Sequence, residues 1–406
     1  MSFYYLFLFV IILEYLWDSV LNVWNVFYST KVSKIPDILS DKISPEDFEK
    51  SKKYLKDTTR VKIIKIYINL FINLWFIIWG FPYFEKFVSN LTDSLILQSL
   101  LFFGIYWIIH SLITLPIKAY SIFVIENKYG FNTMSGKTFV LDIIRNIIIT
   151  IIFFAPLISL LIWFLNLEQN WWWKVSLAFI AFQLFISWAY PIFFAPLFNK
   201  FTPLDDENLR KKINKLLEKA NFKVSKIFIM DASKRTRKQD AYLTGIGKSR
   251  RLVLFDTILN YSPEEILAVI AHELGHNVKK HIPKLLISFS IFYTFMFYLT
   301  NLVYNFLQNN NIFGVNSVYA TFTYAFLFIA SILYFATPII NYFQRKFEYD
   351  ADSFSAKLLG TPEHLISALK RLVKENLLNV TPLPIYKIWY YSHPSPEERL
   401  KKLRQD

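Results

Sequence analysis

The residues most suited to chemistry lie at 272–276, which read His-Glu-Leu-Gly-His. Residues 262–265, upstream, read Ser-Pro-Glu-Glu and have the side chains of a helix start, namely a hydroxyl acceptor, a first-turn proline and a glutamate that reaches back. On that helix His272 and His276 share one face and can bind the same metal ion. Two imidazoles and one carboxylate suit zinc and leave a fourth position for water, whose proton Glu273 is placed to accept. The alternative is a chance match on a soluble helix.

A third metal ligand has to come from elsewhere in the chain, which has six histidines and no cysteine. Glu348 and Asp352 stand four residues apart at the end of a strongly apolar segment, so a helix presents both on one face. The apolar neighbours Phe347 and Phe354 favour burial of that face over a solvated acidic helix end. We therefore predict Glu348 as the third ligand and Asp352 as an acceptor that orients a ligand histidine.

The composition indicates an integral membrane protein. Of the 406 residues, 54% are hydrophobic and 19% are aromatic, which is rare in a soluble domain. The absence of cysteine excludes disulfides, thiol nucleophiles and thiolate metal ligands. The net charge of +14 fits basic loops that face the cytosol and anionic lipid, so we expect the lipid bilayer as a partner and no nucleic acid.

A bilayer core needs about 20 apolar residues per helix. We expect seven spans, at residues 3–27, 62–84, 94–116, 140–165, 174–196, 284–307 and 319–343. Residues 31–60 carry eight lysines or arginines, whereas the loops after the second, fourth and sixth spans carry almost none, which predicts an external N-terminus and a cytosolic C-terminus. The predicted units are 1–196 (five membrane helices with the cytosolic loop 31–60), 197–283 (the first part of a cytosolic protease domain, with the His-Glu-Leu-Gly-His helix), 284–343 (two membrane helices) and 344–406 (the Glu348 helix and the rest of that domain).

Several polar groups lie within the predicted spans, among them Glu14, Asp18, His110 and Arg145. A charge that faces lipid costs about 2.5–3.5 kcal/mol at mid-membrane, so these groups should face protein or water. One interpretation is that they pair with neighbouring helices as structural contacts. The other is a water-filled interior.

Short β-rich segments at 226–230, 241–245 and 251–255 precede the predicted metal-binding helix. A strand in that place commonly offers an edge on which a protease binds an extended peptide, although a purely structural hairpin fits the pattern as well. Near the C-terminus, His393 and Arg399 can either reach the site as donors to a developing oxyanion or lie on the surface.

Together these features resemble one family, the zinc-dependent type I CAAX prenyl proteases, over nearly the whole chain. The resemblance rests on Glu126-Asn127-Lys128-Tyr129-Gly130-Phe131-Asn132, Ala195-Pro196-Leu197-Phe198-Asn199, Met230-Asp231-Ala232-Ser233-Lys234-Arg235, Val253-Leu254-Phe255-Asp256-Thr257, His272 to His276, Phe347-Glu348-Tyr349-Asp350-Ala351-Asp352, and Ser392-His393-Pro394 with Arg399. It implies an α-helical integral membrane protein in which seven transmembrane helices enclose a chamber, with a small cytosolic α+β zinc metalloprotease domain.

The resemblance also implies roles for individual residues. It gives one Zn²⁺ per chain with ligands His272, His276 and Glu348, Glu273 as general base, Asp352 beside the ligands, and His393 and Arg399 as groups that hold the substrate or the oxyanion. The chain departs from the family in one place, since Asp240-Ala241-Tyr242 stands where the family usually has Asn-Ala-Tyr in the substrate-binding segment. An asparagine donates and accepts hydrogen bonds, whereas an ionised aspartate only accepts, so we expect substrate binding to be affected more than metal chemistry.

We therefore expect an intramembrane zinc metalloendopeptidase that removes the C-terminal tripeptide of prenylated CAAX proteins or peptides. Two alternatives stay open: a quality-control protease for misfolded or stalled membrane proteins, and a non-catalytic membrane scaffold. The expected partner is a prenylated or membrane-associated polypeptide. Richness in Lys, Ile, Asn and Phe favours a bacterial inner membrane, a eukaryotic host would place the protein in the endoplasmic reticulum, and in both cases the active site would face the cytosol.

Overall fold

The computed structural model describes residues 2–167, 170–245 and 250–405. Outside that part lie Met1, 168–169, 246–249 and Asp406, which belong to the predicted units 1–196, 197–283 and 344–406. Within the described part, six helical segments are long and apolar enough to span a membrane, and a bent pair makes a seventh candidate. The six are α1 (Phe3–Lys31), α2 to α3 (Pro45–Trp75 and Phe81–Ser89, joined by a π turn), α4 (Leu95–Tyr120, extended by a π turn to Glu126), α5 (Gly136–Leu167), α6 to α7 (Trp172–Ala189 and Ala195–Phe198, again joined by a π turn) and α10 (His281–Asn310). This confirms the prediction of a helical membrane protein with about seven spans.

The seventh predicted span, 319–343, is not one straight helix. It consists of α11 (Val318–Tyr334) and α12 (Thr337–Leu359), which meet at a bend of 53°. Pro338 stands in the first turn of α12. A proline cannot donate a backbone hydrogen bond, and its ring would clash with the carbonyl of Tyr334 in a continuous helix, so the helix breaks there. Because of this break, α12 leaves the direction of α11.

Helix α2 begins inside the segment 31–60, which the sequence analysis predicts only as a cytosolic loop. The capping box at Ser44 is present, with its hydroxyl accepting from the Asp47 amide and the Asp47 carboxylate accepting from Ser44. From Pro45 the helix then continues without interruption to Trp75, into the second span. No glycine or proline lies between Pro45 and Trp75 to end it.

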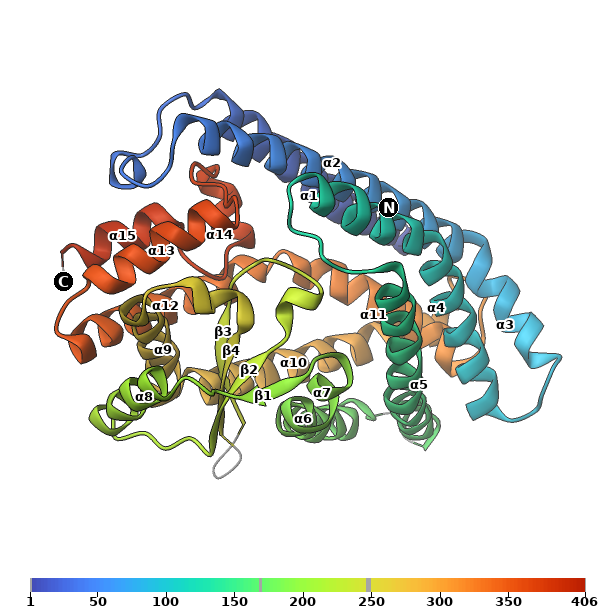
Figure 1. Cartoon of the computed structure of the whole chain (residues 1–406). Helices are drawn as coiled ribbons and strands as arrows, with labels where there is room; N and C mark the ends of the chain where they lie inside the picture. The colour runs from blue at the N-terminus through green and yellow to red at the C-terminus, as the bar shows by residue number, and fades with distance from the viewer. Residues whose placement is uncertain (1, 168–169, 246–249, 406) are drawn as a thin grey trace.

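A four-stranded sheet with the order β1-β2-β4-β3 lies beside the helices (Figure 1). Its strands are β1 (Phe201–Pro203), β2 (Lys226–Met230), β3 (Ala241–Thr244) and β4 (Arg251–Phe255). Strands β2 and β4 are parallel, and β3 runs antiparallel to β4 at one edge. The three predicted strands are confirmed, and β1 is a fourth strand that the sequence analysis does not predict. The remaining helices are α8 (Glu207–Lys219), α9 (Pro263–Val278), α13 (Glu363–Glu375), α14 (Pro384–Tyr390) and α15 (Pro396–Leu403).

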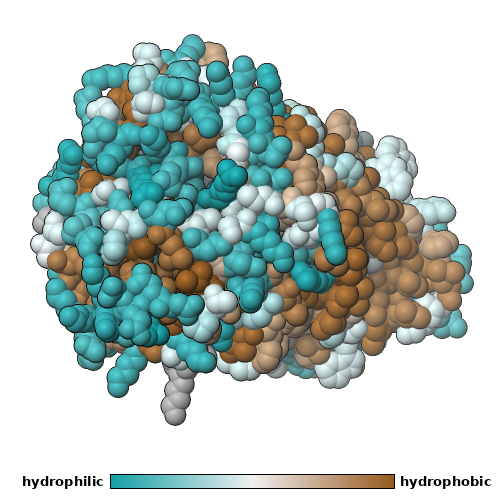
Figure 2. Space-filling view, viewed as in Figure 1, coloured by the Kyte–Doolittle hydropathy of each residue, from teal (hydrophilic) through white to brown (hydrophobic). Residues whose placement is uncertain are grey.

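The surface divides into a polar and an apolar half. Polar side chains gather over the half that holds α8, α13 and α15, and apolar side chains cover much of the half that holds the membrane helices (Figure 2). Phe71, Leu112 and Ile291, all on predicted spans, are 68%, 64% and 66% exposed. Exposed apolar surface on this scale marks contact with lipid rather than water.

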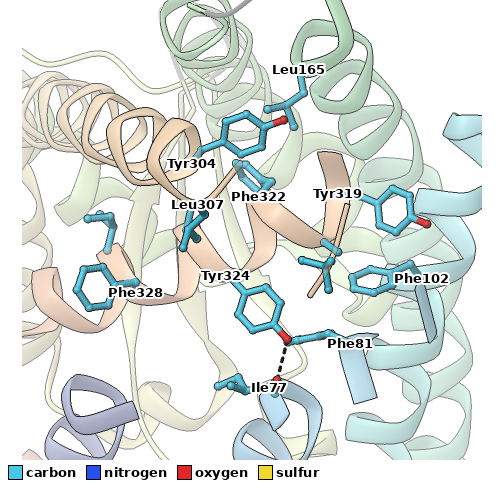
Figure 3. Packing of buried hydrophobic residues seen from close by; sticks show 14 of the residues in the cluster. Ile77, Phe81, Phe102, Leu165, Tyr304, Leu307, Tyr319, Phe322, Tyr324 and Phe328 are labelled. Carbon is cyan, nitrogen blue, oxygen red and sulfur yellow. Dashed lines mark hydrogen bonds between the residues drawn. The ribbon is translucent and has the colours of Figure 1, made fainter. Parts of the chain in front are cut away.

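The membrane half has an aromatic core around Tyr324 of α11 (Figure 3). Its ring stacks on Phe313 at 4.0 Å between centroids and meets the edge of Phe81 at 5.7 Å. The Tyr324 hydroxyl is completely buried and donates to the backbone carbonyl of Ile77 at 2.7 Å, inside the π turn that joins α2 to α3. This bond supplies the partner that a buried tyrosine hydroxyl requires.

One face of α1 is joined to the C-terminal part of the chain by a row of polar contacts, which we call the α1 clamp. The row consists of a Tyr390 hydroxyl that donates to Asp18, a Tyr386 hydroxyl that donates to Asn22 (3.2 Å), a Leu383 amide that donates to Asn25 (2.9 Å) and a Ser29 hydroxyl that donates to the Thr381 carbonyl (2.9 Å). Asp18 also lies 3.8 Å from the ammonium group of Lys62. For Asp18, the structure therefore supports pairing with neighbouring elements.

Candidate metal centre

Helices α9 and α12 pack against each other and bring three possible metal ligands together. Helix α9 starts at the predicted capping box of Ser262 and Glu265. The two ring nitrogens His272 Nε2 and His276 Nε2 lie 3.2 Å apart. Glu348 of α12 places its carboxylate oxygens 3.4 Å from His272 Nε2 and 3.3 Å from His276 Nε2.

The close approach of the two helices depends on Gly275, which lies between the two histidines. A Cβ atom at Gly275 would come within 2.9 Å of the Ala351 Cα and 3.1 Å of the Ala351 carbonyl oxygen. Beside this contact, the Ser355 hydroxyl donates to the Ala268 carbonyl at 2.9 Å and joins the two helices directly. A side chain at this position would therefore force the two helices apart.

The first histidine is held by a carboxylate on its far side. His272 Nδ1 lies 2.8 Å from Asp352 Oδ1, which leaves Nε2 free to face the other ligands. Arg399 of α15 binds the same carboxylate twice, through Nε at 2.8 Å and Nη2 at 2.6 Å. Burial opposes the charge on Arg399, but the Asp352 carboxylate more than offsets this and raises the pKa of the guanidinium. His272, Asp352 and Arg399 thus form a fixed chain behind the site.

The second histidine has a partner that the sequence analysis did not single out. His276 Nδ1 lies 3.1 Å from His281 Nδ1, at the start of α10. Between α9 and α10 Lys280 adopts a left-handed conformation with φ of 57°. A left-handed lysine cannot be inferred from residue type, so the available signal was only the spacing of His281, five residues after His276.

A cavity of about 520 Å³ opens at the site and is lined by Glu273, Asp240, Ala241, His393 and Arg399 among others. Burial raises the pKa of the Glu273 carboxyl. His393 Nε2 lies 3.3 Å from a Glu348 oxygen, while its Nδ1 lies 2.9 Å from the Ser392 hydroxyl. The structure therefore brings Glu273, His393 and Arg399 to one cavity with the possible ligand His272.

The three residues 240–242 do not all face this cavity. Asp240 and Ala241 line it, and desolvation by the cavity walls raises the pKa of Asp240. Tyr242 is absent from the lining, and its ring meets the edge of Phe255 while its hydroxyl lies 3.9 Å from the Met230 sulfur. Successive side chains on a strand point to opposite faces, so Ala241 and Tyr242 cannot both reach the cavity with their side chains.

The donor set fits a bound cation. Among the described residues, His272, His276 and Glu348 form one group that could hold a metal ion, with one donor atom from each lying within 4.8 Å of the others. Glu348 Oε2 is buried and has no hydrogen-bond partner. A buried carboxylate oxygen without a partner is costly, and a cation at the centre of the group would satisfy it.

Comparisons with known proteins agree with this arrangement. Residues 25–200 match the model of the CAAX prenyl protease N-terminal region with five membrane helices, and residues 203–406 match that of peptidase family M48. The chain is 32% identical to CAAX prenyl protease 1 of Saccharomyces cerevisiae, over 97% of this chain and 93% of the relative. It is 31% identical to the CAAX prenyl protease 1 homolog of Arabidopsis thaliana, over 97% and 95%. The crystal structure of S. mikatae Ste24p superposes with a TM-score of 0.91 at 29% identity, covering 99% of both chains.

Proposed function

The chain belongs to peptidase family M48 and to the CAAX prenyl proteases within it, and from this premise we propose that it removes the C-terminal tripeptide of prenylated CAAX proteins or peptides. It is a membrane metalloprotease by family. The observation that carries the proposal is the convergence of His272, His276 and Glu348, together with a cavity that His272 and Glu273 both line. Family membership supplies the substrate class, and this convergence supplies the chemistry.

We propose zinc as the metal, one ion per chain. Two ligands at about 2.0–2.1 Å from a tetrahedral zinc ion are about 3.3 Å apart. The separation of the two histidine nitrogens, 3.2 Å, is close to this value, and each histidine lies 3.3–3.4 Å from a different oxygen of the Glu348 carboxylate. A His₂Glu set also leaves a fourth position open, as in catalytic zinc sites. Zinc held by these three residues would supply a Lewis acid. It would polarise the scissile carbonyl and make water acidic enough to react near neutral pH.

Glu273 is the proposed general base. It follows the first ligand directly and lines the cavity, so its carboxylate can accept the proton of the attacking water and pass it to the leaving amine. Because burial raises its pKa, the carboxyl holds a proton more readily than a surface glutamate, which suits the second transfer.

His393 and Arg399 have different proposed tasks. His393 Nε2 faces the ligand cluster from the cavity side and can donate to the oxyanion of the tetrahedral intermediate. Arg399 commits Nε and Nη2 to Asp352, and its Nη1 lies 3.8 Å from Glu348. Its proposed task is therefore to hold Asp352 and His272 in place, with one amino group left for the oxyanion or substrate.

The substrate would add to the sheet at β3. This strand lies at the sheet edge, and Ala241 lines the cavity, so an extended peptide paired with β3 would pass the metal site. Asp240 accepts from the Ala241 amide at 2.8 Å. We propose that its carboxylate selects against acidic substrate residues near the scissile bond.

We propose that the protein is a multi-pass membrane protein whose active site faces the cytosol. The basic loop 31–60 is placed on the same side. Composition favours a bacterial inner membrane. The relatives compared above are eukaryotic, which favours the endoplasmic reticulum for a eukaryotic host.

The test is cleavage of a farnesylated C-terminal peptide by detergent-purified protein, beside the same peptide without the prenyl group. Glu273→Gln should abolish cleavage while zinc content stays near one per chain, and Glu363→Gln, on the exposed start of α13, should cleave as wild type. Cleavage of both peptides at equal rates would instead favour the alternative function, a quality-control protease for membrane proteins. Cleavage that survives Glu273→Gln would refute the proposed mechanism.

A further inference from the structure

His281 is a buried histidine that none of the roles above uses. Its side chain is 1% exposed and begins α10 directly after the left-handed Lys280. The chain reversal at Lys280 brings the His281 ring back to His276, with 5.2 Å between ring centroids and 3.1 Å between the two Nδ1 atoms. A buried imidazole pair this close requires a defined arrangement of protons, because both nitrogens cannot donate to each other.

The metal site decides that arrangement. A histidine that binds a metal through Nε2 carries its proton on Nδ1, and that N–H needs an acceptor. For His276 the acceptor within reach is His281 Nδ1. We propose that His281 is a positioning residue that accepts the His276 Nδ1 proton and so turns His276 Nε2 towards the metal. The proposal rests on the metal site proposed above.

The surroundings of His281 fix its ring in the accepting orientation. The ring stacks on Phe347 at 4.4 Å with an interplanar angle of 11°. With Nδ1 accepting, the proton of His281 lies on Nε2, which has no hydrogen-bond partner and lies 3.9 Å from Asp350 Oδ2. Phe347 precedes the ligand Glu348, so the same segment of α12 that supplies the third ligand also holds His281.

The two ligand histidines are consequently oriented by different acceptors. His272 donates to a carboxylate, Asp352, which is fixed by Arg399. His276 donates to the neutral imidazole of His281. A neutral imidazole polarises the histidine that binds the metal less than a carboxylate does. His281 is not itself a fourth ligand, since its Nδ1 faces His276 Nδ1 on the side away from Glu348 and the cation-binding group comprises the other three residues.

The experiment measures zinc affinity of the detergent-solubilised full chain by competition with a chelator, independently of cleavage. His281→Phe keeps a flat ring on Phe347 but removes the acceptor, and should bind zinc about 10- to 100-fold more weakly. His281→Asn restores an acceptor oxygen near the position of Nδ1 and should recover most of that loss. His364→Phe, which replaces a histidine of α13, is the matched control and should leave zinc affinity unchanged.

Two outcomes would overturn the proposal. Wild-type zinc affinity in His281→Phe would mean that His276 needs no acceptor there. Equal losses in the Phe and Asn variants would mean that ring packing, and not the hydrogen bond, matters. If the wild-type chain binds no zinc at all, the metal site itself fails, which is a separate result. Replacement of zinc by cobalt adds a second readout. If His281 only positions His276, the metal keeps the same number of histidine ligands in the wild type and in His281→Asn. The two proteins should then give the same class of cobalt spectrum.

Discussion

Replacing Gly275 by alanine tests whether the spacing of α9 and α12 controls the metal site. The added Cβ would lie 2.9 Å from the Ala351 Cα, whereas ordinary contacts begin at 3.4 Å. The two backbones must therefore separate by about 0.5 Å, because neither contact atom can rotate away. His272 and His276 move with one helix and Glu348 with the other, so the donor triangle opens.

The expected loss is larger in catalysis than in stability. Overpacking costs about 1–3 kcal/mol, and alanine recovers about 1 kcal/mol as the better helix former, which leaves a net destabilisation of roughly 0–2 kcal/mol. A displacement of about 1 Å at a reacting centre can cost about 100-fold, so half that displacement corresponds to about tenfold in kcat/KM. Zinc affinity should fall by a similar factor.

The assay compares kcat/KM on the farnesylated peptide and zinc affinity for Gly275→Ala and for Gly104→Ala. Gly104 lies in α4 with no heavy atom within 4 Å of an added Cβ, so its replacement should change neither quantity. If Gly275→Ala keeps kcat/KM and zinc affinity within twofold of wild type, the close approach of the helices does not control the site and the reasoning is wrong.

Three further predictions concern stability. Tyr324→Phe leaves the buried Ile77 carbonyl without its donor and should lower the free energy of unfolding by about 1–3 kcal/mol, seen as a lower thermal midpoint in detergent. Removal of zinc by a chelator should lower the thermal midpoint of the wild type. If zinc was present at 100 times its Kd, the free energy of unfolding should fall by about 2.7 kcal/mol. An unchanged midpoint would argue against a bound metal. The hydrogen-bonded Lys370 ammonium lowers the pKa of Asp41, so their pair stabilises the fold above the unfolded carboxyl value of about 3.9 and is lost as pH falls through the folded value. Asp41→Asn should therefore lose less stability than wild type between pH 5 and pH 2.

The parts of the site that could be predicted from the sequence depend on local spacing. His272 and His276, and likewise Glu348 and Asp352, are four residues apart, and helix geometry alone puts each pair on one face. The capping box at Ser262 marks the start of α9 in the same local way. These signals need no knowledge of the rest of the fold.

The parts that could not be predicted depend on contacts distant in sequence or on backbone conformation. The left-handed Lys280 turns His281 back to His276, and residue type gives no sign of it. The sequence places Arg399 near the site, but its pairing with Asp352 depends on the packing of α15 on α12. The alternation of β3 sends Tyr242 away from the cavity, although it belongs to the same motif as Ala241.

The α1 clamp has a consequence for how the enzyme is made. The paired residues of the clamp are 352 to 372 positions apart in the sequence. Helix α1 is therefore synthesised long before the C-terminal residues that bind it. At about 5–20 residues per second the interval is roughly 20–70 s. His393 and Arg399 emerge later still, after Tyr390. Once Glu348 is made, the nascent chain therefore holds the three proposed metal ligands before it holds Arg399, which fixes Asp352 behind the site. We expect a newly inserted copy to stay inactive towards neighbouring chains in the membrane until the segment from Thr381 to Tyr390 docks on α1.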